Sequence, residues 1–328
     1  MTSYILNRFA WAIPMLFLVS IAAFTVIQLP PGDYATALVA EMRANGDTPP
    51  EGTEERLRHQ LGLDRPMYEQ YGTWIGNIVL HGDFGTSLTY NQPVSNLIWS
   101  RLALTVAISF ASLLLTWVIA IPIGVYAAAR QYSFLDYFFT IFGFLGRGFP
   151  EFLSALILMW VAYSWMGMNV GGLFSPQMQD APWSLAKVGD MFGHLWIPLL
   201  VLATSGAAGL IRVVRANMLD ELNKPYVETA LAQGLTEWAV IWRYPVRVAL
   251  NPFISTIGWA LPALISGDVI TSVVLNLPTT GPLLLRALQS QDMYLSGSFI
   301  LILGVFTILG TIVSDILLAI SDPRIRYR

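Results

Sequence analysis

The chain has 328 residues, of which 55% are hydrophobic and 12% charged, with a formal net charge of −3 at pH 7. Soluble domains carry about 25% charged residues, so the composition indicates lipid as the solvent, and the small net charge argues against nucleic acid as a partner. The chain has no cysteine, which excludes disulfides and thiol chemistry.

Apolar runs long enough to cross a bilayer recur along the chain. A membrane-spanning helix needs roughly 20 predominantly apolar residues, and its backbone satisfies its own hydrogen bonds. The runs cover residues 9–29, 102–129, 135–166, 195–214, 253–275 and 298–320. The first run is long and lacks an A-x-A cleavage site, so we interpret it as an uncleaved helix. The sequence therefore predicts an all-α membrane protein with six transmembrane helices.

The chain divides by composition into three parts: residues 1–30 with the first helix, a polar loop over 31–98, and a transmembrane core over 99–328 that contains a loop at 217–250. The polar loop carries nine acidic residues against four arginines. Short helices are expected at about 53–61 and 66–80. The loop is interpreted either as a solvated cap over the bundle or as a docking surface.

Lysine and arginine placement predicts the orientation, because these residues concentrate in short cytoplasmic segments. With the N-terminus in the cytoplasm, ten of them lie inside: Arg8, Arg130, Arg212, Arg215, Lys224, Arg243, Arg247, Arg324, Arg326 and Arg328. Outside the long loop, only Arg101, Lys187 and Arg286 fall on the other side. We expect a multi-pass protein of the bacterial inner membrane with both termini and the 217–250 loop in the cytoplasm.

The segment YVETALAQGLTEWAVIWRYPVR (226–247) interrupts the apolar pattern with two short helical patterns. In the first, Tyr226, Val227, Ala230 and Leu231 are predicted to share one face. Pro225 suits the first helical position, Gly234 suits a helix stop, and Thr236 suits a cap for the next helix.

In the second pattern Trp238, Ile241, Trp242 and Pro245 follow the i, i+3, i+4, i+7 spacing of one helix face,. This spacing predicts a helix–turn–helix that exposes large apolar side chains. Taken alone, it fits equally an amphipathic hairpin on the inner leaflet and a docking element for a partner protein.

Further motifs extend from one end of the chain to the other. They are YILNRFAWAIPMLFLVS followed by PPGD, LGLDRPMYEQY, GDFGTS, IPIGVYAA, GLIRVVRANMLDEL, ALNPF and SDILLAISDPRIRY. ETALAQG (228–234) resembles the EAA-x-x-x-G loop of bacterial ABC importer permeases. Jointly these motifs make the chain resemble the permease subunits of oligopeptide/dipeptide-type importers.

The resemblance implies a type I ABC importer permease fold, in which the segment forms a coupling helix in a cleft of the ATPase. It implies as partners a second permease of similar fold in a heterodimer, two cytoplasmic ATPase subunits that bind ATP and Mg, and an extracytoplasmic solute-binding protein. No cofactor is expected on this chain itself. The implied coupling residues are Glu228, Thr229, Ala230, Gly234, Trp238, Ile241, Trp242 and Tyr244.

Two departures from the family pattern stand out. Tyr244 and Pro245 replace a usual histidine and alanine, and SVVLNLPTTG (272–281) replaces E-T-V-F-S-x-P-G-x-G after the fifth helix. The substrate is therefore expected to be a peptide or an oligosaccharide-like solute delivered by the binding protein.

Charged side chains within the apolar runs are candidate elements of the translocation pathway, because such groups usually face the bundle interior. Arg147 and Glu151 are four residues apart around Pro150, a spacing that permits an intrahelical ion pair. The pair is interpreted either as a pathway lining or as a structural pair. Asp268 in the fifth run is expected to face the pathway or the partner subunit.

No arrangement of residues indicates an enzyme. The sequence contains no phosphate-binding GxxxxGK[ST] motif,, and its three histidines lie far apart, so neither ATP hydrolysis nor a metal site is expected on this chain. An ion-coupled secondary transporter is the alternative, but the internal repeat and matched broken helices typical of that class are not seen.

Overall fold

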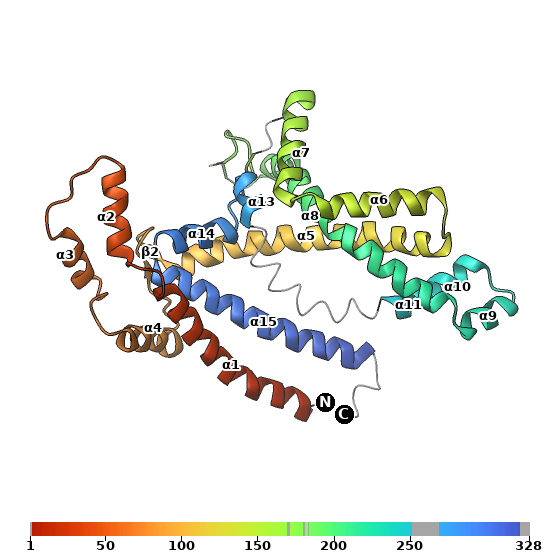
Figure 1. Cartoon of the computed structure of the whole chain (residues 1–328), viewed down its shortest axis with the longest axis horizontal. Coiled ribbons are helices and arrows are strands. Elements are labelled where there is room, and N and C mark those ends of the chain that lie inside the picture. The colour runs from red at the N-terminus through yellow and green to blue at the C-terminus, as the bar shows by residue number, and fades with distance from the viewer. Residues whose placement is uncertain (1, 169–170, 180, 183, 251–268, 322–328) are drawn as a thin grey trace.

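The structure is a computed structural model that describes residues 2–168, 171–179, 181–182, 184–250 and 269–321 (Figure 1). In this part of the chain the fold is helical apart from one antiparallel pair of two-residue strands. In chain order the elements are α1 (Thr2–Gln28), α2 (Tyr34–Ala44), α3 (Thr53–Gln60), α4 (Met67–His81), β1 (Thr86–Ser87), β2 (Gln92–Pro93), α5 (Val94–Ala129), α6 (Phe134–Gly148), α7 (Glu151–Met166), α8 (Leu185–Leu222), α9 (Pro225–Ala232), α10 (Glu237–Arg243), α11 (Pro245–Ala249), α13 (Val269–Val274), α14 (Thr280–Gln289) and α15 (Met293–Ser321).

Four helices of the described part are long and apolar enough to cross a membrane. They are α1, α5, α8 and α15, and they coincide with the first, second, fourth and sixth predicted spans. The fifth predicted span, 253–275, lies mostly in residues 251–268, outside the described residues, and α13 covers its end. The count of six transmembrane helices stays a prediction.

The predicted third span, 135–166, is interrupted at its proline and is not one continuous helix. The structure has two helices there, α6 and α7, and α7 leaves α6 at a steep angle (Figure 1). Proline disfavours a helical conformation in the residue before it and has no N–H for the helix ladder. Pro150 accordingly adopts an extended conformation, with φ −59° and ψ 136°, and precedes the first residue of α7.

The long helices α5 and α8 form the centre of the fold and pack along much of their length. Small residues let their backbones approach closely. A Cβ atom on Gly124 of α5 would lie only 2.6 Å from Val214 Cβ of α8. Farther along the pair, Thr116 Oγ1 donates to the Ala203 carbonyl at 3.3 Å. The pair therefore forms a close, continuous contact.

The polar loop after α1 is packed onto the ends of α1 and α15. Helices α3 and α4 confirm the predicted short helices at 53–61 and 66–80, and α2 was not predicted. Trp74 of α4 is buried against Phe24 of α1. The fully buried Asp292 accepts hydrogen bonds from Ser87 Oγ at 2.5 Å and Thr89 N at 3.0 Å, which fastens the β1–β2 turn to the start of α15.

Candidate functional site

Residues 225–249, which we call the elbow, comprise α9, α10 and α11. Pro225 occupies the first turn of α9, as predicted, where its missing N–H costs nothing,. Helix α9 ends just before Gly234, whose φ of +85° is a left-handed conformation that favours glycine,. Thr236 holds the N-cap position of α10, but its side chain makes no capping hydrogen bond. The predicted helix–turn–helix is thus confirmed, although its cap is not.

The inner face of the elbow is part of the protein core. Ile241 of α10 and Val246 and Ala249 of α11 form a buried cluster with side chains from the ends of α5 and α8, namely Val125, Ala128, Val214 and Met218. Asn217 Nδ2 of α8 also donates to the Ala249 carbonyl at 3.2 Å. Displacement of α10 or α11 would therefore disturb the ends of both long helices.

Helix α9 is held by a second, smaller cluster. Val227 and Ala230 pack against Val240 of α10, and the half-buried Tyr244 lies against them. The predicted apolar face of α9 is divided, because Tyr226 and Leu231 are exposed while Val227 and Ala230 are buried. Pro245 is buried and begins α11. The family-divergent Tyr244–Pro245 pair thus packs largely inside the elbow.

The outer face of the elbow carries large exposed side chains. Trp238 and Trp242 are 41% and 48% exposed, and Glu228 and Thr229 are also exposed. Ile241, expected on the same face, is only 2% exposed. Helix α10 ends at Arg243, so the predicted stripe is not one helix face. Of the predicted coupling residues, Ile241 and Ala230 are therefore buried within the elbow and do not lie on its outer face.

Two polar contacts hold the elbow at its edges. Arg130, just after α5, pairs with Glu237 of α10 at 3.2 Å. The Tyr226 hydroxyl donates to Glu221 Oε2 at 2.6 Å. Burial and the neighbouring Glu221 carboxylate both raise the pKa of Tyr226 above its ordinary value, so the hydroxyl stays protonated and keeps donating at neutral pH.

The predicted pathway residues are not assembled into one site in the described part of the chain. Glu151 begins α7 and accepts a hydrogen bond from the Ser205 hydroxyl of α8. Because α6 ends at Gly148, Arg147 and Glu151 are not in one helix, and the predicted intrahelical spacing does not occur. The side chain of Arg147 and the whole of Asp268 lie outside the described residues.

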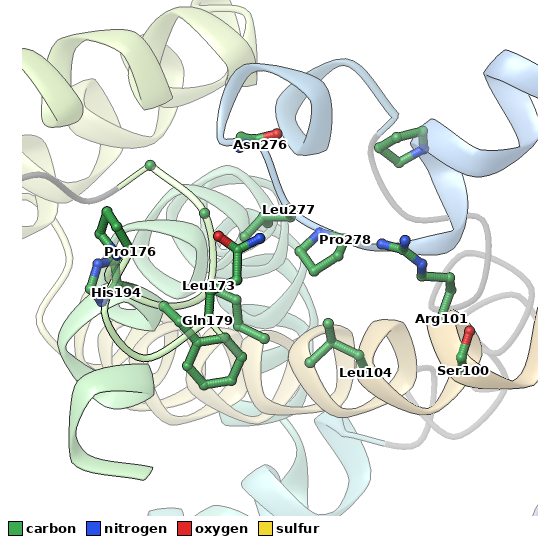
Figure 2. A pocket seen from close by; sticks show the side chains of 14 residues that line it. Ser100, Arg101, Leu104, Leu173, Pro176, Gln179, His194, Asn276, Leu277 and Pro278 are labelled. Atoms are coloured by element: carbon green, nitrogen blue, oxygen red, sulfur yellow. The ribbon is translucent and has the colours of Figure 1, made fainter. Parts of the chain in front are cut away.

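A cavity of about 830 Å³, shown in Figure 2, is lined by residues from several segments of the chain. It lies at the opposite end of the α5–α8 pair from the elbow. Arg101 and Leu104 line it from the first part of α5, and His194 lines it from the first part of α8. The elbow, by contrast, contacts the last turns of these helices. Sequence reasoning missed this cavity, because its lining comes from segments far apart in the chain.

Comparison with known proteins places these features in a family. The model described as "Binding-protein-dependent transport system inner membrane component" matches residues 120–327. A second model, for the N-terminal part of membrane components of such systems, matches residues 1–109. The chain belongs to this family of inner membrane transport components. This permease is therefore an integral protein of the inner membrane, as the composition predicts.

Curated relatives match the permease over its full length. The oligopeptide transport system permease protein AppB of Bacillus subtilis is 35% identical, and the alignment covers 100% of both chains. A putative peptide permease protein of Brucella suis is 35% identical over 99% of each chain. A probable peptide ABC transporter permease protein of Sinorhizobium fredii is 31% identical, again over 99% of each. These names bear out the resemblance drawn from the motifs.

Proposed function

We propose that the chain is the transmembrane permease subunit of an ATP-driven peptide importer and forms half of its translocation pathway. The relatives named as peptide permeases support a peptide rather than an oligosaccharide-like substrate. The family description supports delivery by a binding protein. The partners would be a second permease in a heterodimer, two ATPase subunits that bind ATP and Mg, and that binding protein.

In this proposal the elbow couples ATP hydrolysis to transport. The observation that carries it is the division of the elbow into two faces: Trp238 and Trp242 are exposed, while Ile241 shares a core with α5 and α8. A closing ATPase dimer would pull on the outer face, and the shared core would move the two long helices together. Coupling of this kind needs two discrete packings of the bundle that the ATPase biases.

The proposed topology places the elbow and both termini in the cytoplasm and the 31–98 loop outside. The chain has no cysteine, so single cysteines report accessibility without background. In vesicles that contain the permease without its ATPase subunits, a cysteine in place of Trp238 is expected to react with a membrane-impermeant maleimide only when the vesicles are inverted. A cysteine at Gly46 is expected to react in right-side-out vesicles. Reversed labelling would overturn the orientation.

The coupling role is tested at Gly234. Valine strongly disfavours a φ of +85°, so Gly234→Val is expected to distort the α9–α10 turn. We expect peptide uptake into proteoliposomes and transport-stimulated ATP hydrolysis both to fall by about tenfold or more, because the distorted turn would no longer hold α9 and α10 in the docking geometry. Co-purification of the ATPase subunits should weaken in parallel.

Gly46→Val is the matched control, because Gly46 has a φ of +90° and, like Gly234, open space around its Cβ position. It introduces similar strain far along the chain from the elbow and should leave ATPase co-purification unchanged. Uptake and stimulated hydrolysis that both survive Gly234→Val would contradict coupling through the elbow. Uptake driven by an ion gradient without ATP would contradict the importer itself.

A further inference from the structure

The cavity at the far end of α5 and α8 has an asymmetric lining (Figure 2). Arg101 and His194 stand at its two ends, and Leu104, Leu277 and Pro278 lie between them. Its volume of about 830 Å³ lies in the range of ligand sites, which measure about 300–1,000 Å³. The cavity is therefore large enough for a small peptide.

The wall formed by residues 171–179 is fastened to α8. Lys187 Nζ donates to the carbonyls of Gln179 at 3.0 Å and Ala181 at 2.6 Å. Asp190 accepts from the backbone N–H and the hydroxyl of Ser175, both at 2.8 Å. These bonds hold the wall against the start of α8, so the cavity is a formed feature of the fold.

The opposite wall of the cavity is formed by residues 275–282, and it is joined both to the first wall and to α5. The backbone N–H of Gly172 donates to the Leu275 carbonyl at 2.8 Å, which connects the two walls. The backbone N–H of Thr280 donates to the buried Thr105 hydroxyl of α5 at 2.9 Å. Arg101 lies one helical turn before Thr105 in α5. The hydrogen bond between Thr280 and Thr105 therefore also keeps Arg101 at the edge of the cavity.

The lining contains one cationic side chain, Arg101, and no acidic one among its 14 residues, all in the described part of the chain. Asp190, one turn before His194, is engaged by Ser175 and lies 3.9 Å from His194 Nδ1. The Arg101 side chain is half-buried, and within the described residues no carboxylate pairs with its guanidinium. A guanidinium presents a planar fork of donors that matches a carboxylate.

We propose that this cavity is a receiving site for a peptide carboxylate, with Arg101 binding the carboxylate and the Leu104–Leu277 wall contacting the adjacent side chain. The inference rests on the proposed peptide import. To that proposed function the inference adds one substrate feature, a free carboxylate. This subunit would bind the carboxylate after the binding protein has released the peptide.

The test compares uptake of three probes by the complete transporter in proteoliposomes: the tripeptide Ala-Phe-Ala as the free acid, the same peptide with a C-terminal amide, and Ala-Glu-Ala amide. Hydrogen bonds to charged groups are worth more than neutral ones, so Arg101→Gln is expected to raise the KM for the free acid by about tenfold or more. The KM for Ala-Phe-Ala amide should be unchanged. The response of Ala-Glu-Ala amide shows whether a side-chain carboxylate serves as well as the terminal one.

Arg101→Lys keeps the charge and should retain most of the preference for the free acid. Arg43→Gln removes an exposed arginine of α2 and should change none of the three KM values. The same binding protein is present throughout, so its own selectivity cancels when the KM of one probe is compared between the variant and the unmodified transporter. Equal changes for acid and amide in Arg101→Gln would overturn the receiving site and leave peptide import standing. Failure of the unmodified transporter to import any probe would contradict peptide import and this inference together.

Discussion

Arg215 of α8 holds Asp136 of α6 with two parallel hydrogen bonds, from Nε to Oδ1 at 2.8 Å and from a terminal nitrogen to Oδ2 at 2.9 Å. Asp136 also accepts from the backbone N–H of Tyr132 at 3.0 Å and is only 3% exposed. This one carboxylate therefore joins the turn after α5 to α8. Arg130, in the same turn, reaches the elbow through Glu237.

Asp136→Asn is expected to destabilise the protein by about 1–3 kcal/mol, because it leaves the partly buried Arg215 without its charged partner. Glu237→Gln removes a pair whose side chains are half-exposed and should cost less than about 1 kcal/mol. Thermal unfolding of the purified permease in detergent measures both. An equal effect of the two substitutions would show that the Asp136 pair is no more than a surface contact.

Gly124→Ala is expected to destabilise the α5–α8 contact by about 1–3 kcal/mol, as overpacking usually does. The new Cβ would stand 2.6 Å from Val214 Cβ and 3.0 Å from the Ile211 carbonyl oxygen. Gly193→Ala is the control, since Gly193 lies within α8 with nothing within 4 Å of its Cβ position, and alanine favours the helix there. An equal loss of melting temperature in both variants would contradict a close contact between α5 and α8 at Gly124.

Ile241→Ala and Trp242→Ala are expected to separate stability from docking. Ile241 is buried in the core beneath the elbow, so its truncation should cost about 2–4 kcal/mol of unfolding free energy. Trp242 is 48% exposed, so its truncation should leave the melting temperature nearly unchanged and weaken ATPase co-purification. Thermal unfolding and ATPase co-purification are measured on the same preparations. A large loss of melting temperature in Trp242→Ala, together with weakened co-purification of a stable Ile241→Ala, would contradict the assignment of the two faces.

The contact between α2 and α3 is expected to depend on pH. Burial alone would raise the pKa of Asp33, but hydrogen bonds from Arg58, at 2.6 Å, and from Thr36 outweigh it and hold the pKa below 3.8. The unfolded state therefore binds the proton first as the pH falls. The stabilisation is fully present above about pH 4 to 5 and is lost as the pH falls through the folded pKa.

Hydrogen exchange of residues 34–60 between pH 6 and pH 3, corrected for its intrinsic pH dependence, measures this effect. Protection should decline at the acid end of the range. Asp33→Asn is expected to show lower protection at pH 6 and a flatter profile. A profile identical to that of the unmodified chain would mean that Asp33 does not hold α2 and α3 together.

Local features of the sequence predicted much of the elbow. Pro225 and Gly234 act through their own backbone preferences, so the start of α9 and its stop were predictable from nearest neighbours. The orientation of side chains was not. Trp238, Ile241 and Trp242 have similar apolar character, and only the arrival of α5 and α8 from elsewhere in the chain turns Ile241 inward and leaves the tryptophans exposed.

The sequence by itself determined the membrane class, the helices at 53–61 and 66–80, and the helix–turn–helix of the elbow, because hydropathy, helix period and backbone preference are properties of short stretches. Only the tertiary structure decided that Asp136 meets Arg215 across 79 residues and that Arg101 and His194 bound one cavity. These relationships depend on how distant helices pack, and no local pattern encodes which side chains that packing brings together.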